Sequence, residues 1–200
     1  ASPAYVATFH NHHRILEIIE RTAPETFTLP GPGGYLPSTI AALKGHYEST
    51  LVIARIAPET FNHKVKGENN ITPALLAAQN GFPRVLTIIA NTAPKSFLTP
   101  KSSDKSTPAH AAAFKGHADC LEILAKTNPA ILSERTSETR LPAFFAAQEG
   151  HVDCLKIILN YAPETLMDNT EGSPAFIAAQ MGQMGSVQFF AEQKPEALAL

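Results

Sequence analysis

The sequence repeats itself, and the spacing of its prolines defines the repeat. A proline that opens each copy recurs in steps of 34, 36, 35, 34 and 32 residues. These prolines are Pro3, Pro37, Pro73, Pro108, Pro142 and Pro174. A self-similar period of about 20 to 50 residues is typical of proteins in which one small unit stacks on copies of itself. We number positions from this proline, so that position +4 lies four residues after it.

Equivalent positions carry residue types that each have a role in folding. Position +4 is alanine in all six copies, which indicates a helix packed tightly against its neighbours. Position +8 is Asn11 in the first copy and glycine in the others, the residues that end a helix in the left-handed conformation. Positions +13 and +16 are mostly large and apolar, as in Leu121 and Leu124, which gives a second helix one buried stripe. The pattern predicts two helices in each copy.

The ends of these helices are also encoded. Hydroxyl residues that can cap the first helix precede four of the prolines, namely Ser2, Thr72, Thr107 and Ser173. Leu36 and Leu141 hold this place in the second and fifth copies and cannot cap. A proline at position +21 is expected to end the second helix, and an apolar residue at +24 to plug the turn beneath it. Since all length variation falls in the loops before the opening prolines, those loops are expected along one free edge.

The best-formed copy, residues 107–132, reads Thr-Pro, then His110, then Ala-Ala, then Gly-His before an apolar helix. This pattern resembles the ankyrin repeat, and the resemblance extends over essentially the whole chain. It implies an all-α fold: an ankyrin-repeat solenoid of stacked helix pairs, with loop or hairpin fingers and a concave binding face. We expect residues 1–200 to form a single domain whose repeats start near residues 2, 36, 72, 107, 141 and 173. The tetratricopeptide repeat has a similar period but lacks the Thr-Pro start and the Gly-His break.

The chain departs from the ankyrin pattern after the second helix. Ala-Pro-Glu-Thr-Phe or a related phrase replaces the usual Gly-Ala and polar stretch, and the loops lack an Asp-x-x-Gly turn. Regular β-hairpin fingers, plain loops and short helical turns therefore all remain open for these segments.

Composition narrows the classes of function. The formal net charge of −2 predicts no bulk affinity for nucleic acid. No apolar run approaches the 18 or so residues of a membrane span, so none is expected. Cys120 and Cys154 occupy position +12 of successive copies, where packed helices lie roughly 8–10 Å apart, beyond the reach of a disulfide. We interpret both as reduced core thiols and expect a cytoplasmic protein.

The histidines are interpreted as structural. His10, His12 and His13 form a cluster, but Glu17 is the single acidic residue near them and no cysteine is close, whereas zinc needs about four convergent ligands. In the ankyrin pattern, the histidine at +9 closes the turn between the two helices by hydrogen bonding. No paired carboxylates, phosphate loop or Ser/His/Asp set appears at a defined spacing. The sequence therefore predicts no cofactor, no metal and no catalytic residue.

The residues that folding does not explain are the candidates for binding. In ankyrin arrays, positions +6 and +7 face the concave side, and here several of them are apolar or charged. Together with loop residues, the predicted partner-binding set is Phe9, Tyr35, Leu43, Lys44, Lys66, Lys101, Lys105, Phe114, Lys115, Arg135, Arg140 and Glu149. The middle loops are basic, whereas the last loop carries Asp168 and Glu171. This charge distribution favours a partner with an acidic patch near the middle loops. The alternative interpretation is that these residues have no partner: single exposed apolar side chains and solvated loop charges are normal on a protein surface.

Neither end of the array has the polar outer face of a capping repeat, since the last copy carries Met181, Met184 and Phe190. We therefore expect additional repeats or domains beyond both ends, or a subunit that covers them. The leading hypothesis is a non-enzymatic protein-protein interaction module. The alternative is a targeting or regulatory arm of a larger enzyme, or of a bacterial effector acting in the host cytoplasm. A hydrolase built into the solenoid is a third hypothesis.

Overall fold

The computed structural model describes residues 1–65, 70–100, 103–170 and 172–199. These residues form twelve α-helices and no strand, and their β-structure is one isolated antiparallel bridge between Val65 and Ile71. No helix among them is long and apolar enough to cross a membrane. The chain divides into two compact units, unit 1 (residues 1–102) and unit 2 (residues 103–200), each containing three copies of the repeat. The expectation of a single domain stays a prediction.

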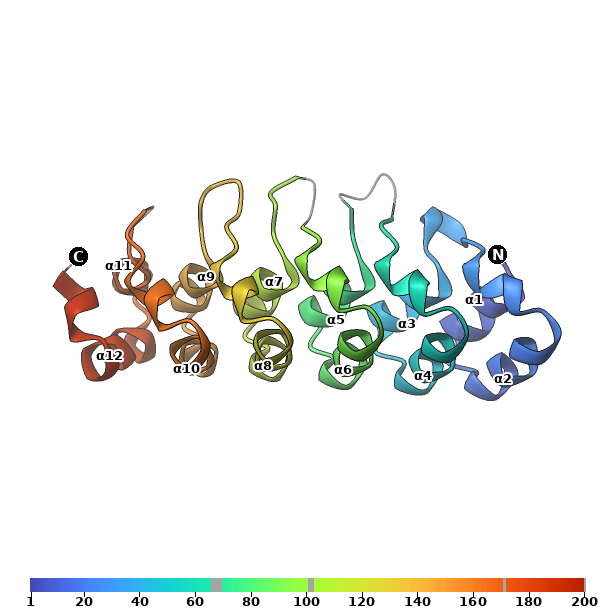
Figure 1. The fold of residues 1–200 in the computed structure, drawn as a ribbon. Helices are drawn as coiled ribbons and strands as arrows, with labels where there is room; N and C mark the ends of the chain where they lie inside the picture. Colours follow the sequence, from blue (N-terminus) through green and yellow to red (C-terminus); the bar gives the residue numbers. More distant parts are fainter. Residues whose placement is uncertain (66–69, 101–102, 171, 200) are drawn as a thin grey trace. The chain divides into compact units, whose positions relative to one another are not determined.

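Unit 1 contains three helix pairs. They are α1 (Pro3–Phe9) with α2 (His13–Thr22), α3 (Pro37–Lys44) with α4 (Tyr47–Ile56), and α5 (Pro73–Gln79) with α6 (Pro83–Thr92). Short 3₁₀ helices follow, namely η1 (Pro24–Thr28), η2 (Pro32–Gly34), η3 (Pro58–Asn62) and η4 (Pro94–Leu98). The first helices, α1, α3 and α5, pack side by side, and the second helices form a parallel row against them (Figure 1).

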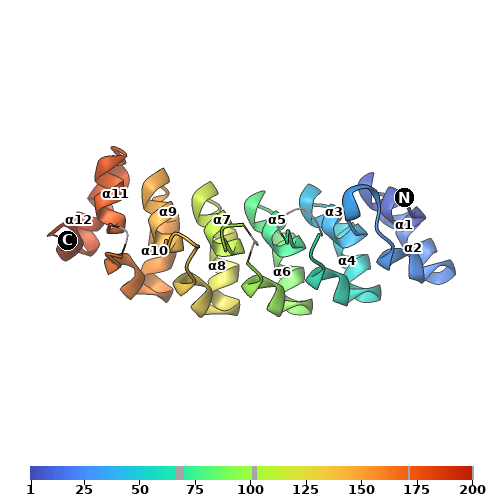
Figure 2. The ribbon, with the colours of Figure 1, turned by 90° about the horizontal axis from the view of Figure 1, so that it is seen from above.

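Unit 2 repeats this arrangement. Its pairs are α7 (Pro108–Lys115) with α8 (Ala118–Thr127), α9 (Pro142–Glu149) with α10 (Val152–Tyr161), and α11 (Pro174–Gln180) with α12 (Met184–Gln193). The 3₁₀ helices are η5 (Pro129–Ser133), η6 (Pro163–Met167) and η7 (Pro195–Ala199). Seen from above, α9 lies between α7 and α11, with their partners α8, α10 and α12 beside them (Figure 2).

The helix starts confirm the capping pattern. The side chains of Ser2, Thr72 and Ser173 accept a hydrogen bond from the backbone N–H three residues on, at 3.2, 3.2 and 3.1 Å. Thr107 forms a capping box with His110. Leu36 and Leu141 provide no cap. Position +8 has a positive φ in all six copies, from 57° at Asn11 to 79° at Gly150, as the left-handed helix end requires.

The proline at +21 does more than end the second helix. Each second helix ends two residues earlier, and the proline then opens a 3₁₀ helix of five residues. The residue at +24 lies on this 3₁₀ helix and is fully buried in the first five copies, from Phe27 to Leu166. The alanines at +4 are at most 5% exposed. The predicted plug and the predicted tight helix packing are therefore both confirmed.

The side chain at position +9 joins neighbouring copies. The resemblance assigns this histidine to the turn of its own copy, but His46 Nδ1 lies 3.1 Å from the Thr8 carbonyl and His151 Nε2 lies 3.2 Å from the Phe114 carbonyl. Both carbonyls belong to the preceding first helix. Gln183 does the same in the last copy, donating to the Gln148 carbonyl at 2.9 Å.

The third copy replaces this bond in another way. Phe82 stands at its position +9 and has no polar atom to donate. Asn80, two residues earlier, instead donates to the Leu43 carbonyl at 3.4 Å. A carbonyl at the end of the preceding first helix is thus occupied at each junction within a unit.

The leucines at +24 in the last two copies permit a matched test of the plug. Leu166→Ala should lower the free energy of unfolding by about 2–5 kcal/mol, because Leu166 is fully buried and truncation leaves a cavity. Leu198→Ala should cost under about 1 kcal/mol, because Leu198 is 45% exposed. Urea unfolding followed by circular dichroism measures both, and equal losses would contradict the assignment of the plug.

Candidate functional site

Unit 1 carries an aromatic and cationic surface at the ends of its first helices, which we call the Phe9 patch (Phe9, Leu43 and Lys44). The Phe9 ring is 40% exposed, and Lys44 Nζ lies 4.0 Å from its centroid. Leu43, on the same helix as Lys44, is half-buried. The ammonium on an aromatic face is a cation–π contact, which holds the two exposed side chains together.

Unit 2 carries a larger surface of the same kind, the Phe114 patch (Phe114, Lys115, Arg140 and Phe145). Phe114 is 39% exposed and meets Phe145 edge to face, with centroids 6.2 Å apart. Lys115 Nζ lies 5.2 Å from the Phe114 ring. The Arg140 guanidinium lies 4.9 Å from the ring of Phe144, which in turn packs edge-on against Phe145. Lys115 thus lies beside the exposed ring of Phe114, whereas Arg140 lies on the buried ring of Phe144 and is also paired with Glu138 at 2.7 Å.

Phe145 is a member that reasoning from the sequence missed. It stands at +3 of its copy, whereas only +6 and +7 were considered. A signal was present, because +3 precedes +6 and +7 by three and four residues and so shares their face of the helix. Its contact with Phe114, from a different copy, depends on how α7 and α9 pack.

The buried side chain of His110 contacts two members of the Phe114 patch, Phe145 and Arg140. Its ring is 2% exposed, lies 5.8 Å from the Phe145 ring and places Nε2 3.1 Å from the Arg140 carbonyl. Nδ1 accepts the Thr107 N–H at 3.1 Å, so the proton resides on Nε2, which donates to the Arg140 carbonyl. Burial lowers the pKa of His110 to about 4, partly offset by the bond to Arg140. The histidine is thus a neutral structural link between the cap of α7 and the patch.

Arg135 is committed to a partner within unit 2. It donates to both Asp168 carboxylate oxygens, at 2.8 and 3.0 Å, and to the Thr139 carbonyl at 2.7 Å. The hydrogen bond from Arg135 holds the pKa of Asp168 below its usual value. The basic middle loops and the acidic last loop, which suggested an acidic partner, are therefore partly neutralised by each other.

The remaining predicted residues are dispersed. Tyr35 is half-buried beside η2, and Glu149 is half-buried on α9, where it accepts a hydrogen bond from Gln148 at 2.8 Å. Lys105 is exposed in the loop before α7. Lys66 and Lys101 lie outside the described residues, as does Glu171.

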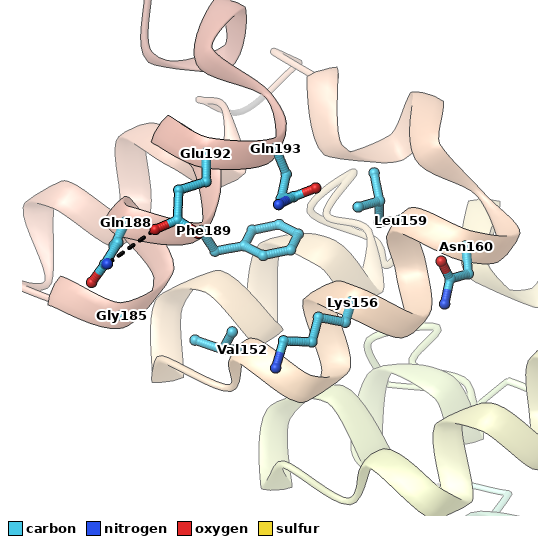
Figure 3. Close-up of a pocket in the computed structure, with 9 residues that line it drawn as sticks. All are labelled: Val152, Lys156, Leu159, Asn160, Gly185, Gln188, Phe189, Glu192 and Gln193. Atoms are coloured by element: carbon cyan, nitrogen blue, oxygen red, sulfur yellow. Dashed lines mark hydrogen bonds between the residues drawn. The ribbon is translucent and has the colours of Figure 1, made fainter.

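A groove between α10 and α12 was not predicted (Figure 3). Its volume is about 610 Å³, and α10 and α12 line it with apolar, amide and charged side chains. The sequence does carry a signal for this groove: Gly185 stands at position +11, where each of the other copies has a charged residue. Within α12, Gln188 donates to Glu192 at 3.0 Å, and within α10, Lys156 donates to Asp153 at 2.9 Å. The groove provides contact surface without a clustered acid and base.

The two cysteines lie in the core of unit 2. Cys120 and Cys154 form no disulfide and are buried, which confirms their assignment as core thiols. Burial raises the pKa of each thiol to about 12, so neither is a thiolate nucleophile at neutral pH. Among the described residues, no three His, Cys, Asp or Glu side chains converge as metal ligands would.

Comparison with known proteins does not assign a family. No protein-family model matches the chain, and no curated protein is significantly similar to it.

The buried His110 predicts a specific pH dependence of stability. Its pKa is about 4 when folded and near 6.5 when unfolded, so the unfolded chain binds the proton first as pH falls through this interval. Between pH 7 and about pH 4, the free energy of unfolding should therefore fall by roughly 2–3 kcal/mol more in the wild type than in His110→Gln. Urea titrations of both proteins give this difference, in which the shared titration of carboxylates cancels. Equal losses would contradict the assignment of His110 as a buried neutral group.

Proposed function

We propose that this chain is an ankyrin-like repeat domain that binds a partner protein and carries out no catalysis. The helix pairs stack as a solenoid, and the partner contacts the face presented by the ends of the first helices. Within each unit, packing of every first helix against the next supports this arrangement. So do the hydrogen bonds between copies.

The observation that carries the proposal is the Phe114 patch. Exposed Phe114 meets Phe145 edge to face, Lys115 lies near the Phe114 ring, and Arg140 lies on the neighbouring ring of Phe144. Aromatic residues and arginine are enriched where protein interfaces are fully desolvated. The chemistry suits a partner segment with an apolar side chain next to a carboxylate, which Lys115 would attract, whereas Arg140 is already paired with Glu138 at 2.7 Å.

The patch is also held in place before any partner arrives. His110 bonds the backbone of Arg140 and packs on Phe145, while His151 bonds the Phe114 carbonyl. A preorganised surface loses little conformational entropy on binding, which favours affinity. The protonated, buried thiols support a reducing compartment, and we propose the cytoplasm.

Replacing Phe114 by Glu should remove the apolar anchor and oppose a partner carboxylate. The wild-type chain would first be used to capture a binding protein from a cell lysate, and titration calorimetry would follow with the purified partner. We expect Phe114→Glu to weaken binding by about 2 kcal/mol or more, roughly 30-fold or greater. Circular dichroism should show unchanged helicity.

Leu51→Glu is the matched control, because Leu51 is 40% exposed, close to the value for Phe114, but lies on the second helix α4. It should bind like the wild type. An unaffected Phe114→Glu variant, or equal losses in both variants, would contradict the proposal. So would a wild-type chain that retains no protein.

A further inference from the structure

Lys115 and Glu149 occupy the same position, +7, on the neighbouring helices α7 and α9 of unit 2. Because α7 and α9 pack side by side, their equivalent side chains are presented on the same side of the unit. Phe114 directly precedes Lys115, and its ring meets Phe145, which lies one helical turn before Glu149. The exposed aromatic surface is therefore bordered by a cation on one helix and an anion on the next.

Neither of these two charges has an ion-pair partner among the described residues. Lys115 is exposed, and its Nζ lies 5.2 Å from the Phe114 ring. Glu149 is half-buried and accepts a hydrogen bond at 2.8 Å from the neutral amide of the preceding side chain. By contrast, Arg140 on the same surface is already paired with Glu138. Lys115 and Glu149 are therefore the charges of this surface that a ligand of complementary charge can pair with.

The spacing of the helices determines which kind of segment can reach both charges. Packed helices lie roughly 8–10 Å apart. A polyproline II segment has three residues per turn and a rise of about 3.1 Å per residue, so side chains three positions apart share one face at a distance of about 9 Å. In a β-strand, residues three positions apart point to opposite faces. An α-helix needs seven residues, about 10.5 Å, to return to the same face. The polyproline II geometry fits the spacing best.

We infer that the ligand of the Phe114 patch is an extended peptide segment with one acidic and one basic residue three positions apart and an apolar residue between them. This inference rests on the proposed function, because it specifies the ligand of that same site. The acidic side chain pairs with Lys115 and the basic one with Glu149, while the apolar one packs on the rings of Phe114 and Phe145. Ion pairs at such exposure add little affinity, so the two charges mainly select the sequence of the ligand.

The test uses a phage-displayed library of random dodecapeptides as the probe. The library is first depleted on Phe114→Glu and then selected on the immobilised wild-type chain. The enriched peptides should share an acidic and a basic residue three positions apart, with an apolar residue between them. Selection on Lys115→Glu should instead enrich two basic residues at this spacing, and selection on Glu149→Lys two acidic residues. Neither result depends on the direction in which the peptide crosses the helices.

Lys126→Glu and Glu122→Lys are the matched controls. They make the same two changes of charge in unit 2, but at an exposed ion pair on the second helix α8. Both should enrich the same peptides as the wild type. Fluorescence anisotropy with a labelled wild-type consensus peptide should show affinity lowered about fivefold or more by Lys115→Glu and by Glu149→Lys, because attraction becomes repulsion, and by less than about twofold in the controls.

Several results would overturn this inference. Enriched peptides that lack one of the charges, or that space them seven residues apart as a helix does, would exclude the extended ligand. The same peptides enriched by the wild type, Lys115→Glu and Glu149→Lys would show that the two charges do not select the ligand. A library that yields no peptide dependent on Phe114 would also overturn the inference. If a captured protein still lost affinity for Phe114→Glu in that case, the proposed function would hold without this ligand.

Discussion

The structure depends on contacts between successive copies, because no helix pair here is stable by its own hydrogen bonds. The first helices have only seven or eight residues and the second helices ten. Isolated helices of this length are marginal in water, so tertiary packing must supply their stability. Alanine at +4 allows close approach, the residue at +24 fills the gap beneath, and the bond to the preceding carbonyl sets the register.

The same packing of neighbouring copies brings together the side chains of the Phe9 and Phe114 patches. The side chains of a patch come from first helices of different copies, or from the loops before them. Lys44 therefore reaches Phe9, and Phe145 reaches Phe114, only because those helices are neighbours. The loops add less than their charges suggest, since Arg135 and Asp168 neutralise each other across two adjacent loops. In the proposed function, apolar and aromatic groups on the helices are therefore the main anchors for a partner.

Much of the local structure was predictable because it depends on near neighbours in the chain. The capping by Ser2, the left-handed backbone at Gly116 and the burial of Leu166 all agree with expectation. The 3₁₀ helix after each proline at +21 was anticipated only as a turn, since five residues give too weak a pattern to separate the two. The ankyrin resemblance implied that the +9 histidine closes the turn between the helices of its copy, but the rings of His46 and His151 bond a carbonyl of the preceding copy, which the motif does not reveal.

The sequence by itself determined the period, the two helices of each copy, their caps and the buried plug, since propensity, chirality and short-range hydrogen bonds act over a few residues. Tertiary structure decided which side chains from different copies meet: Phe114 with Phe145, His110 with the Arg140 carbonyl, and Arg135 with Asp168. These partners lie about one copy apart in the chain. Their proximity is a result of helix packing, which a single sequence does not encode as a local pattern.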